Sequence, residues 1–381
     1  MRKTKIVCTL GPATDGEGVL REMMLAGMNV ARFNFSHGTH PEHKARLEQV
    51  KALRRELNLP VAAMLDTKGP EVRLKNFAGG SVTLQEGQEF TLTVEDVEGD
   101  ATRCAVTYAE LPQDVKAGDT ILLDDGLVRL TVLSTTASAI RCRVENGGVM
   151  KDHKGVNVPG VSLSMPYMSQ QDREDILFGM EEGFDFIAAS FVRSAADVRE
   201  LRKLLESRKS RIRIIAKIEN QEGINNLTEI LAAADGIMVA RGDMGVEIDF
   251  TEIPAIQKNM IAQCVAAVTT KAAADSDVIY IPTDNTAASC TETIGSIVRS
   301  AKTPVVAGEQ GICVGCGIAT LSISYYDLGY KTGEMAAQIL KGEADISQMP
   351  IEYANASKLY NADMCQELGI TVPEGYTALE G

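Results

Sequence analysis

The chain has 381 residues, of which 45% are hydrophobic and 24% are charged, and it carries a formal net charge of −14. This length predicts two or three domains, or one large α/β barrel, in an ordinary soluble globular protein. The negative charge argues against non-specific binding to nucleic acid, although a few local cations can still bind a small anion.

The N-terminal stretch MRKTKIVCTLGPAT contains only a short apolar run, which predicts neither a signal peptide nor a membrane span. The eight cysteines are scattered, and only Cys313 and Cys316 form a C-x-x-C pair. One such pair is weak support for a zinc or redox site. We therefore expect reduced thiols, a cytoplasmic protein and no contact with a membrane.

The first 70 residues alternate predicted strands with predicted helices. Apolar strands are expected at residues 3–11, 29–37 and 60–69, and helices at 16–27 and 40–58. This β-α-β rhythm predicts parallel strands that are buried on both faces.

The pattern changes between residues 71 and 157, where apolar and polar residues alternate between glycine and aspartate turns. This pattern indicates a small antiparallel β domain of the sandwich or barrel type. Strands are expected within five segments, at residues 81–87, 89–97, 119–126, 127–136 and 139–148.

The β/α rhythm returns after residue 158, with strands expected at 185–192, 211–219 and 235–243. Six β/α units result, with the β domain inserted after the third strand. The leading prediction is an α/β fold of the (β/α)8 TIM-barrel type, and a doubly wound open sheet is the second candidate. Barrel active sites lie where the strands end, so polar residues at those positions are candidate site residues.

Alternation along a strand places Arg32, Asn34 and Ser36 on one face of the second predicted strand. A cation beside two oxygen donors can hold a phosphate and a hard metal ion together. The alternative is a solvated strand end whose polar residues only cap the barrel. This stretch alone leaves both interpretations open.

The same alternation places Lys217 and Glu219 on one face of a later strand, and Asp243 lies near the end of the next one. Two carboxylates from neighbouring strand ends suit Mg²⁺, which takes a few oxygen ligands and keeps waters for a substrate phosphate. Lys217 beside them can stabilise the charge of a phosphoryl group during transfer. The alternative is a structural ion pair.

The third predicted strand adds three polar residues, Asp66, Thr67 and Arg73. Each is ambiguous by itself. Because all these residues fall at predicted strand ends, the whole set favours phosphoryl transfer.

Six motifs resemble the pyruvate kinase family and occur in the family's order. They are KTKIVCTLGPAT, NVARFNFSHG, LDTKGPEVR, KGVNVPG, IIAKIENQEG and MVARGDMGVE. The resemblance covers residues 1–264, and the inserted β domain lies where the family has a mobile lid. It implies transfer of phosphate between phosphoenolpyruvate and ADP in glycolysis, giving pyruvate and ATP, with Mg²⁺ and K⁺.

The resemblance also implies a role for each matching residue. Glu219 and Asp243 would hold Mg²⁺, and Lys217 would assist the phosphoryl group. The oxygen ligands of K⁺ would come from Asn34, Ser36, Asp66 and Thr67. The residues in contact with the nucleotide or phosphoenolpyruvate would be Arg32, His37, Arg73 and Lys154. Glu71 matches the form of the motif associated with K⁺ dependence.

The resemblance ends near Cys264, because the T-Q-M and S-G-E-T motifs of the family's last two barrel strands do not follow. Residues 265–381 instead resemble the C-terminal portion of type I periplasmic binding proteins, the substrate receptors of ABC transporters. Stretches such as DVIYIPTDNTAAS and ATLSISYYDLGYKTGEMAAQIL carry this resemblance. It implies that Asp284, Asn285 and Glu309 face a ligand cleft, which binds weakly without the opposing lobe.

The junction raises the question of how the barrel is completed. We hypothesise that the β-α-β pattern of residues 277–308 supplies strands seven and eight, with Thr283 near the position of the family's missing threonine. The alternative is a separate partial sheet beside an open six-stranded barrel. We expect four segments along the chain. They are the first part of the barrel (1–70), the inserted β lid domain (71–157), the second part of the barrel (158–264) and the receptor-like segment (265–381).

Three functions are compatible with these patterns. The first is a pyruvate kinase-type phosphotransferase, impaired by the loss of its usual last strands. The second is a small-ligand-binding module, and the third is a chimera with neither activity. The six motifs favour the first, with phosphoenolpyruvate and ADP or ATP as small-molecule partners, no nucleic acid, and homo-oligomer formation left open.

Overall fold

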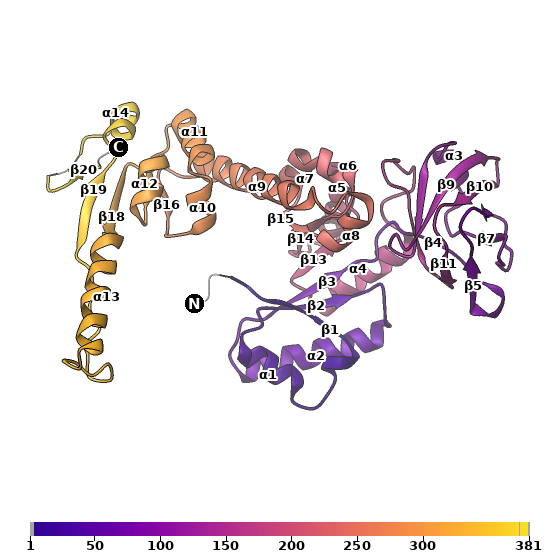
Figure 1. The fold of residues 1–381 in the computed structure, drawn as a ribbon, viewed down its shortest axis with the longest axis horizontal. Coiled ribbons are helices and arrows are strands. Elements are labelled where there is room, and N and C mark those ends of the chain that lie inside the picture. The colour runs from indigo at the N-terminus through magenta and orange to yellow at the C-terminus, as the bar shows by residue number, and fades with distance from the viewer. Residues whose placement is uncertain (1–3, 373, 380–381) are drawn as a thin grey trace. The chain divides into compact units, whose positions relative to one another are not determined.

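The computed structural model describes residues 4–372 and 374–379. The chain divides into two compact units, residues 1–257 and 258–381. The first unit contains a parallel sheet with its helices and a separate β module, and the second contains a five-stranded sheet (Figure 1).

The parallel sheet of the first unit has six strands, and each pairs in parallel with its neighbour. In sheet order they are β1 (Val7–Leu10), β2 (Val30–Asn34), β3 (Ala62–Asp66), β13 (Phe186–Ala189), β14 (Arg213–Ile218) and β15 (Gly236–Val239). The strand order follows the chain without reversal, as in a (β/α) barrel. A doubly wound sheet reverses its order at a switch point, so this second candidate is wrong.

Helices follow these strands along the chain, and two of them show the expected end signals. They are α1 (Val19–Ala26), α2 (His40–Glu56), α4 (Gln170–Glu182), α5 (Ala195–Ser207), α6 (Gln221–Asn225), α7 (Leu227–Ala233) and α8 (Arg241–Glu247). Helix α2 starts with a Thr39–Glu42 capping box, and α1 ends at Gly27, whose φ of 111° requires no Cβ. The inner strands of the parallel sheet are apolar, with Phe33 of β2 and Leu65 of β3 fully buried.

The β module lies between β3 and β13 in the chain. Its larger sheet contains, in order, β4 (Val72–Arg73), β12 (Gly155–Asn157), β8 (Thr120–Leu123), β9 (Val128–Thr135), β10 (Ala139–Val144), β6 (Glu89–Thr93) and β7 (Arg103–Ala105). A second pair joins β11 (Gly148–Lys151) to β5 (Ser81–Leu84), and a short helix α3 spans Leu111–Asp114. Each of the five predicted alternating segments contains one strand. The inward positions form one core around residues such as Phe90, Leu130 and Ile140.

The two outer strands of the parallel sheet, β1 and β15, each pair on one side only within the described residues. Val7 of β1 is 47% exposed, and all four residues of β15 are half-buried. The inner strand β3 is almost fully buried by comparison. Within the described residues the six-stranded sheet is therefore open at both edges, and we call it the half-barrel.

Helix α9 (Ile253–Asp275) has 23 residues and crosses the boundary between the two units without a break. At a rise of about 1.5 Å per residue it is about 34 Å long. Beyond it come the strands β16 (Ile279–Ile281), β17 (Val305–Ala307), β18 (Ala319–Ile323), β19 (Ala356–Tyr360) and β20 (Thr377–Ala378), and the helices α10 (Asn285–Ser289), α11 (Thr291–Ala301), α12 (Gln310–Cys316), α13 (Tyr325–Leu340) and α14 (Ala362–Leu368). Among the residues that the structure describes, no helix has the length and apolar character needed to cross a membrane.

The predicted closure of the barrel by residues 277–308 is wrong. Strand β17 pairs with β16 on one side and with β18 on the other, in a sheet that belongs to the second unit. Val305 and Ile294 are buried in a core shared with α12. The β-α-β pattern is present as predicted, but its strands already have hydrogen-bond partners and a core of their own.

Candidate active site

Lys217 and Glu219 lie at the carboxyl end of β14, on one face of the strand as predicted. Both are buried, at 7% and 2% exposure. The ammonium of Lys217 lies 2.9 Å from Glu219 Oε1, and it donates hydrogen bonds to Asp66 Oδ1 at 3.1 Å and to Ser190 Oγ at 2.8 Å. Strands β3, β13 and β14 therefore place their ends around one cationic group.

Burial and charge perturb both groups of this pair. Burial raises the pKa of Glu219 to about 7 against the opposing effect of Lys217, and the negative charge of Asp243 adds to the rise. Burial also disfavours the Lys217 ammonium, but Glu219 and Asp66 outweigh it and raise its pKa. The lysine thus stays charged, whereas the glutamate gains or loses its proton near neutral pH.

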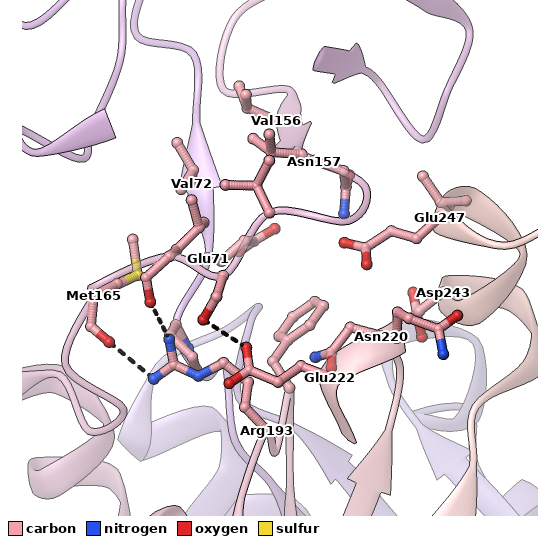
Figure 2. A pocket seen from close by; sticks show the side chains of 18 of the residues that line it. Glu71, Val72, Val156, Asn157, Met165, Arg193, Asn220, Glu222, Asp243 and Glu247 are labelled. Atoms are coloured by element: carbon pink, nitrogen blue, oxygen red, sulfur yellow. Dashed lines mark hydrogen bonds between the residues drawn. The ribbon is translucent and has the colours of Figure 1, made fainter. Parts of the chain in front are cut away.

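Asp243 lies in the first turn of α8, just after β15, and its side chain faces a cavity of about 310 Å³ (Figure 2). The cavity is lined from the β module by residues such as Glu71, Asp125 and Asn157, and from the half-barrel by residues such as Arg193, Asn220 and Glu247. The negative charge of Asp243 contributes to the raised pKa of Glu219, and the two carboxylates follow neighbouring strands, β14 and β15.

The two carboxylates fit a divalent cation. Glu219 Oε1 is buried and lies 2.9 Å from the Lys217 ammonium, so a cation bound to this carboxylate would share that oxygen with the lysine. The described residues hold no group of three or more His, Cys, Asp or Glu side chains arranged for a metal ion. Mg²⁺ is compatible with a pair of carboxylates, because it keeps several waters and takes substrate phosphate as a further ligand.

The structure brings some of the expected K⁺ ligands together. Asn34 and Asp66 are register partners on β2 and β3. The backbone N–H of Ser36 donates to Asn34 Oδ1 at 3.1 Å. The Thr67 hydroxyl is buried and donates to the carbonyl of Ala188 at 3.4 Å. Thr67 is therefore directed toward β13, and Asn34, Ser36 and Asp66 remain the closer group.

Asp66 has more partners than the sequence suggested. Its Oδ2 accepts a hydrogen bond from Arg32 Nε, and its Oδ1 is shared by Lys217 and Ser190. Arg32 also donates to Thr9 Oγ1 at 2.8 Å. Arg32 and Lys217 thus bind opposite oxygens of one buried carboxylate. The Asp66 carboxylate therefore lies between the two positive charges and keeps them apart.

The other predicted phosphate or nucleotide contacts do not join this cluster. His37 is exposed. Arg73 pairs with Glu71 at 2.5 Å and donates to the carbonyl of His153. Lys154 pairs with Asp124 at 2.9 Å within the β module.

Three residues with clear roles in the site were missed by the sequence analysis. Ser190 bridges Lys217 to Asp66 and Thr67, and Phe191 donates its backbone N–H to Glu219 Oε2 at 2.6 Å. Arg193 donates to the carbonyls of Leu163 and Met165, at 2.9 and 2.8 Å (Figure 2). All three follow β13, so the strand-end rule applied to DFIAASFV and the arginine after it was the available signal.

The receptor-like residues of the second unit serve as local caps. Asp284 accepts from the N–H of Ala287 as the N-cap of α10, and Glu309 caps α12 in the same way. Asn285 is the first residue of α10. Thr283 donates to the carbonyl of Gly308 at 3.2 Å, next to β17, and so does not end a barrel strand.

Cys313 and Cys316 are buried in α12, and burial raises their thiol pKa to about 12 and about 11. Their thiols therefore stay protonated, which is unfavourable for zinc or redox chemistry.

Comparison with known proteins identifies two families along the chain. The family described as pyruvate kinase, barrel domain, matches residues 1–309, and the family described as ABC transporter substrate binding protein matches residues 253–379. The two matches overlap in α9 and the start of the second unit. A pyruvate kinase of Staphylococcus aureus strain USA300 is 50% identical over 266 residues, which are 69% of this chain and 46% of that protein, and that of strain N315 matches equally.

The solved structures include a pyruvate kinase from Cryptosporidium parvum, with 34% sequence identity and a TM-score of 0.66. The match covers 81% of this chain and 58% of that one. The chain spans about half the length of the curated relatives it matches. On these comparisons the chain belongs to the pyruvate kinase family through its barrel domain, and its C-terminal residues match the substrate-binding proteins of ABC transporters.

Proposed function

We propose that the chain carries a pyruvate kinase-type phosphotransfer centre, which moves phosphate between phosphoenolpyruvate and ADP with Mg²⁺ and K⁺ as cofactors. The observation that supports this most strongly is the buried Lys217 ammonium, which contacts Asp66, Ser190 and Glu219 beside the acidic cavity. A fixed cation in a site with little water stabilises developing negative charge far better than one in solvent.

The residues divide the work as follows. When bound, a divalent cation would neutralise charge on the phosphate oxygens, with Glu219 and Asp243 as its protein ligands. Lys217 stabilises the phosphoryl group between donor and acceptor, and Arg32 holds it from the side of β2. Asn34, Ser36, Asp66 and Thr67 are proposed for K⁺, and His37, Arg73 and Lys154 for the substrates. These substrate contacts require rearrangement, since Arg73 and Lys154 are paired elsewhere.

The proposed enzyme is slow, because the last two barrel strands of the family and their threonine do not follow β15. Loss of a general acid typically costs about 10²–10⁴-fold in rate. Phosphoryl transfer depends on charge stabilisation by groups that are present, whereas protonation of the product enolate depends on the missing acid. We place this activity in the cytoplasm and in glycolysis, as for the family, and leave oligomer formation open.

A coupled assay of pyruvate formation from phosphoenolpyruvate, ADP, Mg²⁺ and K⁺ tests the proposal. Replacing Lys217 with Ala is expected to lower turnover by about 10²–10³-fold, as for removal of a donor that stabilises transition-state charge. The matched control is Lys116→Ala, on an exposed position of the β module. Equal turnover in wild type and Lys217→Ala would rule out the proposed centre.

A second candidate function, small-ligand binding, follows from the family match of residues 253–379. The structure weakens it, because the carboxylates of Asp284 and Glu309 already accept backbone hydrogen bonds as helix caps. Calorimetry with sugars, amino acids and small carboxylates is expected to show no heat of binding. A saturable signal that is lost in Asp284→Ala would favour this function instead.

A further inference from the structure

The turn that follows β13 contains an unusual backbone conformation. Phe191 has a φ of 53°, in the left-handed region that side chains other than those of Gly, Asn and Asp rarely adopt. The other non-glycine residues with positive φ in the described chain are Asn, Asp, His and Lys. A bulky aromatic residue in this region is an outlier, and such outliers concentrate at functional sites.

The surrounding structure imposes this conformation. A Cβ at Gly69 would lie 2.8 Å from the carbonyl oxygen of Ser190, and one at Gly223 would lie 2.6 Å from that of Val192. Two glycines therefore let neighbouring segments approach the turn from both sides. The hydroxyl of Tyr167 also donates to the Ser190 carbonyl at 3.2 Å.

The turn determines the position of one backbone N–H group, that of Phe191. Phe191 N lies 2.6 Å from Glu219 Oε2, whereas Glu219 Oε1 lies 2.9 Å from the Lys217 ammonium. The backbone N–H thus holds one carboxylate oxygen, and the Lys217 ammonium faces the other, so the orientation of the whole carboxylate is fixed. The φ of residue 191 sets the angle between this N–H and the chain that follows, so an extended residue here could keep its N–H on Glu219 only if residues 192 onward took another path.

The preceding residue anchors the same turn to the lysine. Ser190 Oγ lies 2.7 Å from the carbonyl of Thr67 and 3.0 Å from Asp66 Oδ1, to which its single O–H can donate, and it accepts from Lys217 at 2.8 Å. The side chain of residue 190 and the backbone of residue 191 therefore hold the two members of the Lys217–Glu219 pair separately.

We infer that the left-handed turn at Ser190–Phe191 is the positioning element of the cation site, and that Phe191 acts through its backbone N–H rather than its ring. The inference rests on the proposed function, because it takes Glu219 as a ligand of the divalent cation. Phe191 is a positioning residue: its N–H holds Oε2 and so fixes the orientation of the carboxylate that would bind the cation. Partners of this kind, which orient a metal ligand from outside, are typically worth about 10–100-fold in metal affinity.

Direct binding of Mn²⁺ to the full chain, measured by electron paramagnetic resonance of the free ion, tests the inference without an activity assay. Phe191→Gly and Phe191→Asn remove the ring but tolerate the left-handed region, and they are expected to stay within about threefold of wild type. Phe191→Val disfavours that region and is expected to weaken binding by about tenfold or more. If Gly and Val variants that remain folded by circular dichroism bind equally, the inference is overturned.

A backbone substitution keeps the test decisive if the Val variant fails to fold. Replacing Phe191 with the matching α-hydroxy acid, phenyllactic acid, changes the amide to an ester and removes only the N–H. The ester is expected to weaken Mn²⁺ by about tenfold, and unchanged affinity would overturn the inference. Glu219→Gln separates the two proposals: if it binds Mn²⁺ as tightly as wild type, the proposed function fails as well. If Glu219→Gln binds weakly and the ester binds normally, only the role of the turn fails.

Discussion

Replacing Glu219 with Gln is expected to change the way in which stability depends on pH. The carboxyl group is buried, and its pKa rises from the ordinary 4.5 to about 7. Between these two values the unfolded chain releases this proton while the folded chain keeps it, so this group makes the protein less stable as pH rises. At about 1.4 kcal/mol per pH unit, the whole loss amounts to about 3 kcal/mol above pH 7.

The Glu219→Gln variant has no proton to release at this position. The difference in unfolding free energy, variant minus wild type, is therefore expected to increase by about 2–3 kcal/mol from pH 5 to pH 8. Loss of the contact with Lys217 shifts this difference by a constant amount at every pH. The prediction concerns how the difference changes with pH. Urea unfolding followed by circular dichroism, without divalent ions, measures this difference at each pH.

The control is Glu200→Gln on the exposed face of α5, for which the difference should stay flat. A flat or falling difference for Glu219→Gln would show that its carboxyl group titrates as in water, and the electrostatic reasoning about the site would fail.

Four further variants have expected outcomes. Arg193→Ala removes the hydrogen bonds to two backbone carbonyls in the segment that returns from the β module, and it should lower unfolding free energy by about 1–3 kcal/mol in urea. Arg193→Lys should recover only a fraction of this loss, because an ammonium group cannot reproduce the two donors of the planar guanidinium group. Ile294→Ala in the core of the second unit should cost about 2–5 kcal/mol by the same measurement, whereas Leu340→Ala, at 88% exposure, should stay within about 0.5 kcal/mol. An equal effect of the Ile294 and Leu340 changes would contradict the assigned core.

Much of the local structure could be predicted from the sequence. Side-chain alternation placed Lys217 and Glu219 on one face because a strand has a period of two, and the structure confirms their contact. The alternating segments of the β module were likewise found as strands. These predictions succeeded because the evidence for each lay within a few neighbouring residues.

The predictions that failed depended on distant partners. The β-α-β pattern of residues 277–308 does not specify which sheet it joins, and β17 pairs with β16 and β18. Phe191 was missed because its left-handed backbone is imposed by Gly69 and Gly223, which are remote in the chain. Neither a pairing choice nor a backbone conformation imposed by packing leaves a local pattern.

The open edge of β1 has a consequence for the behaviour of the protein at high concentration. Its outward N–H and C=O groups have no strand partner in the described chain, and Val7 beside them is 47% exposed. Such an edge is a template onto which a strand of another molecule can add, and natural sheets usually guard it with charge, proline or a bulge. Aggregation during overexpression should therefore begin at this strand, and a lysine in place of Val7 should reduce turbidity without altering the Lys217 cluster.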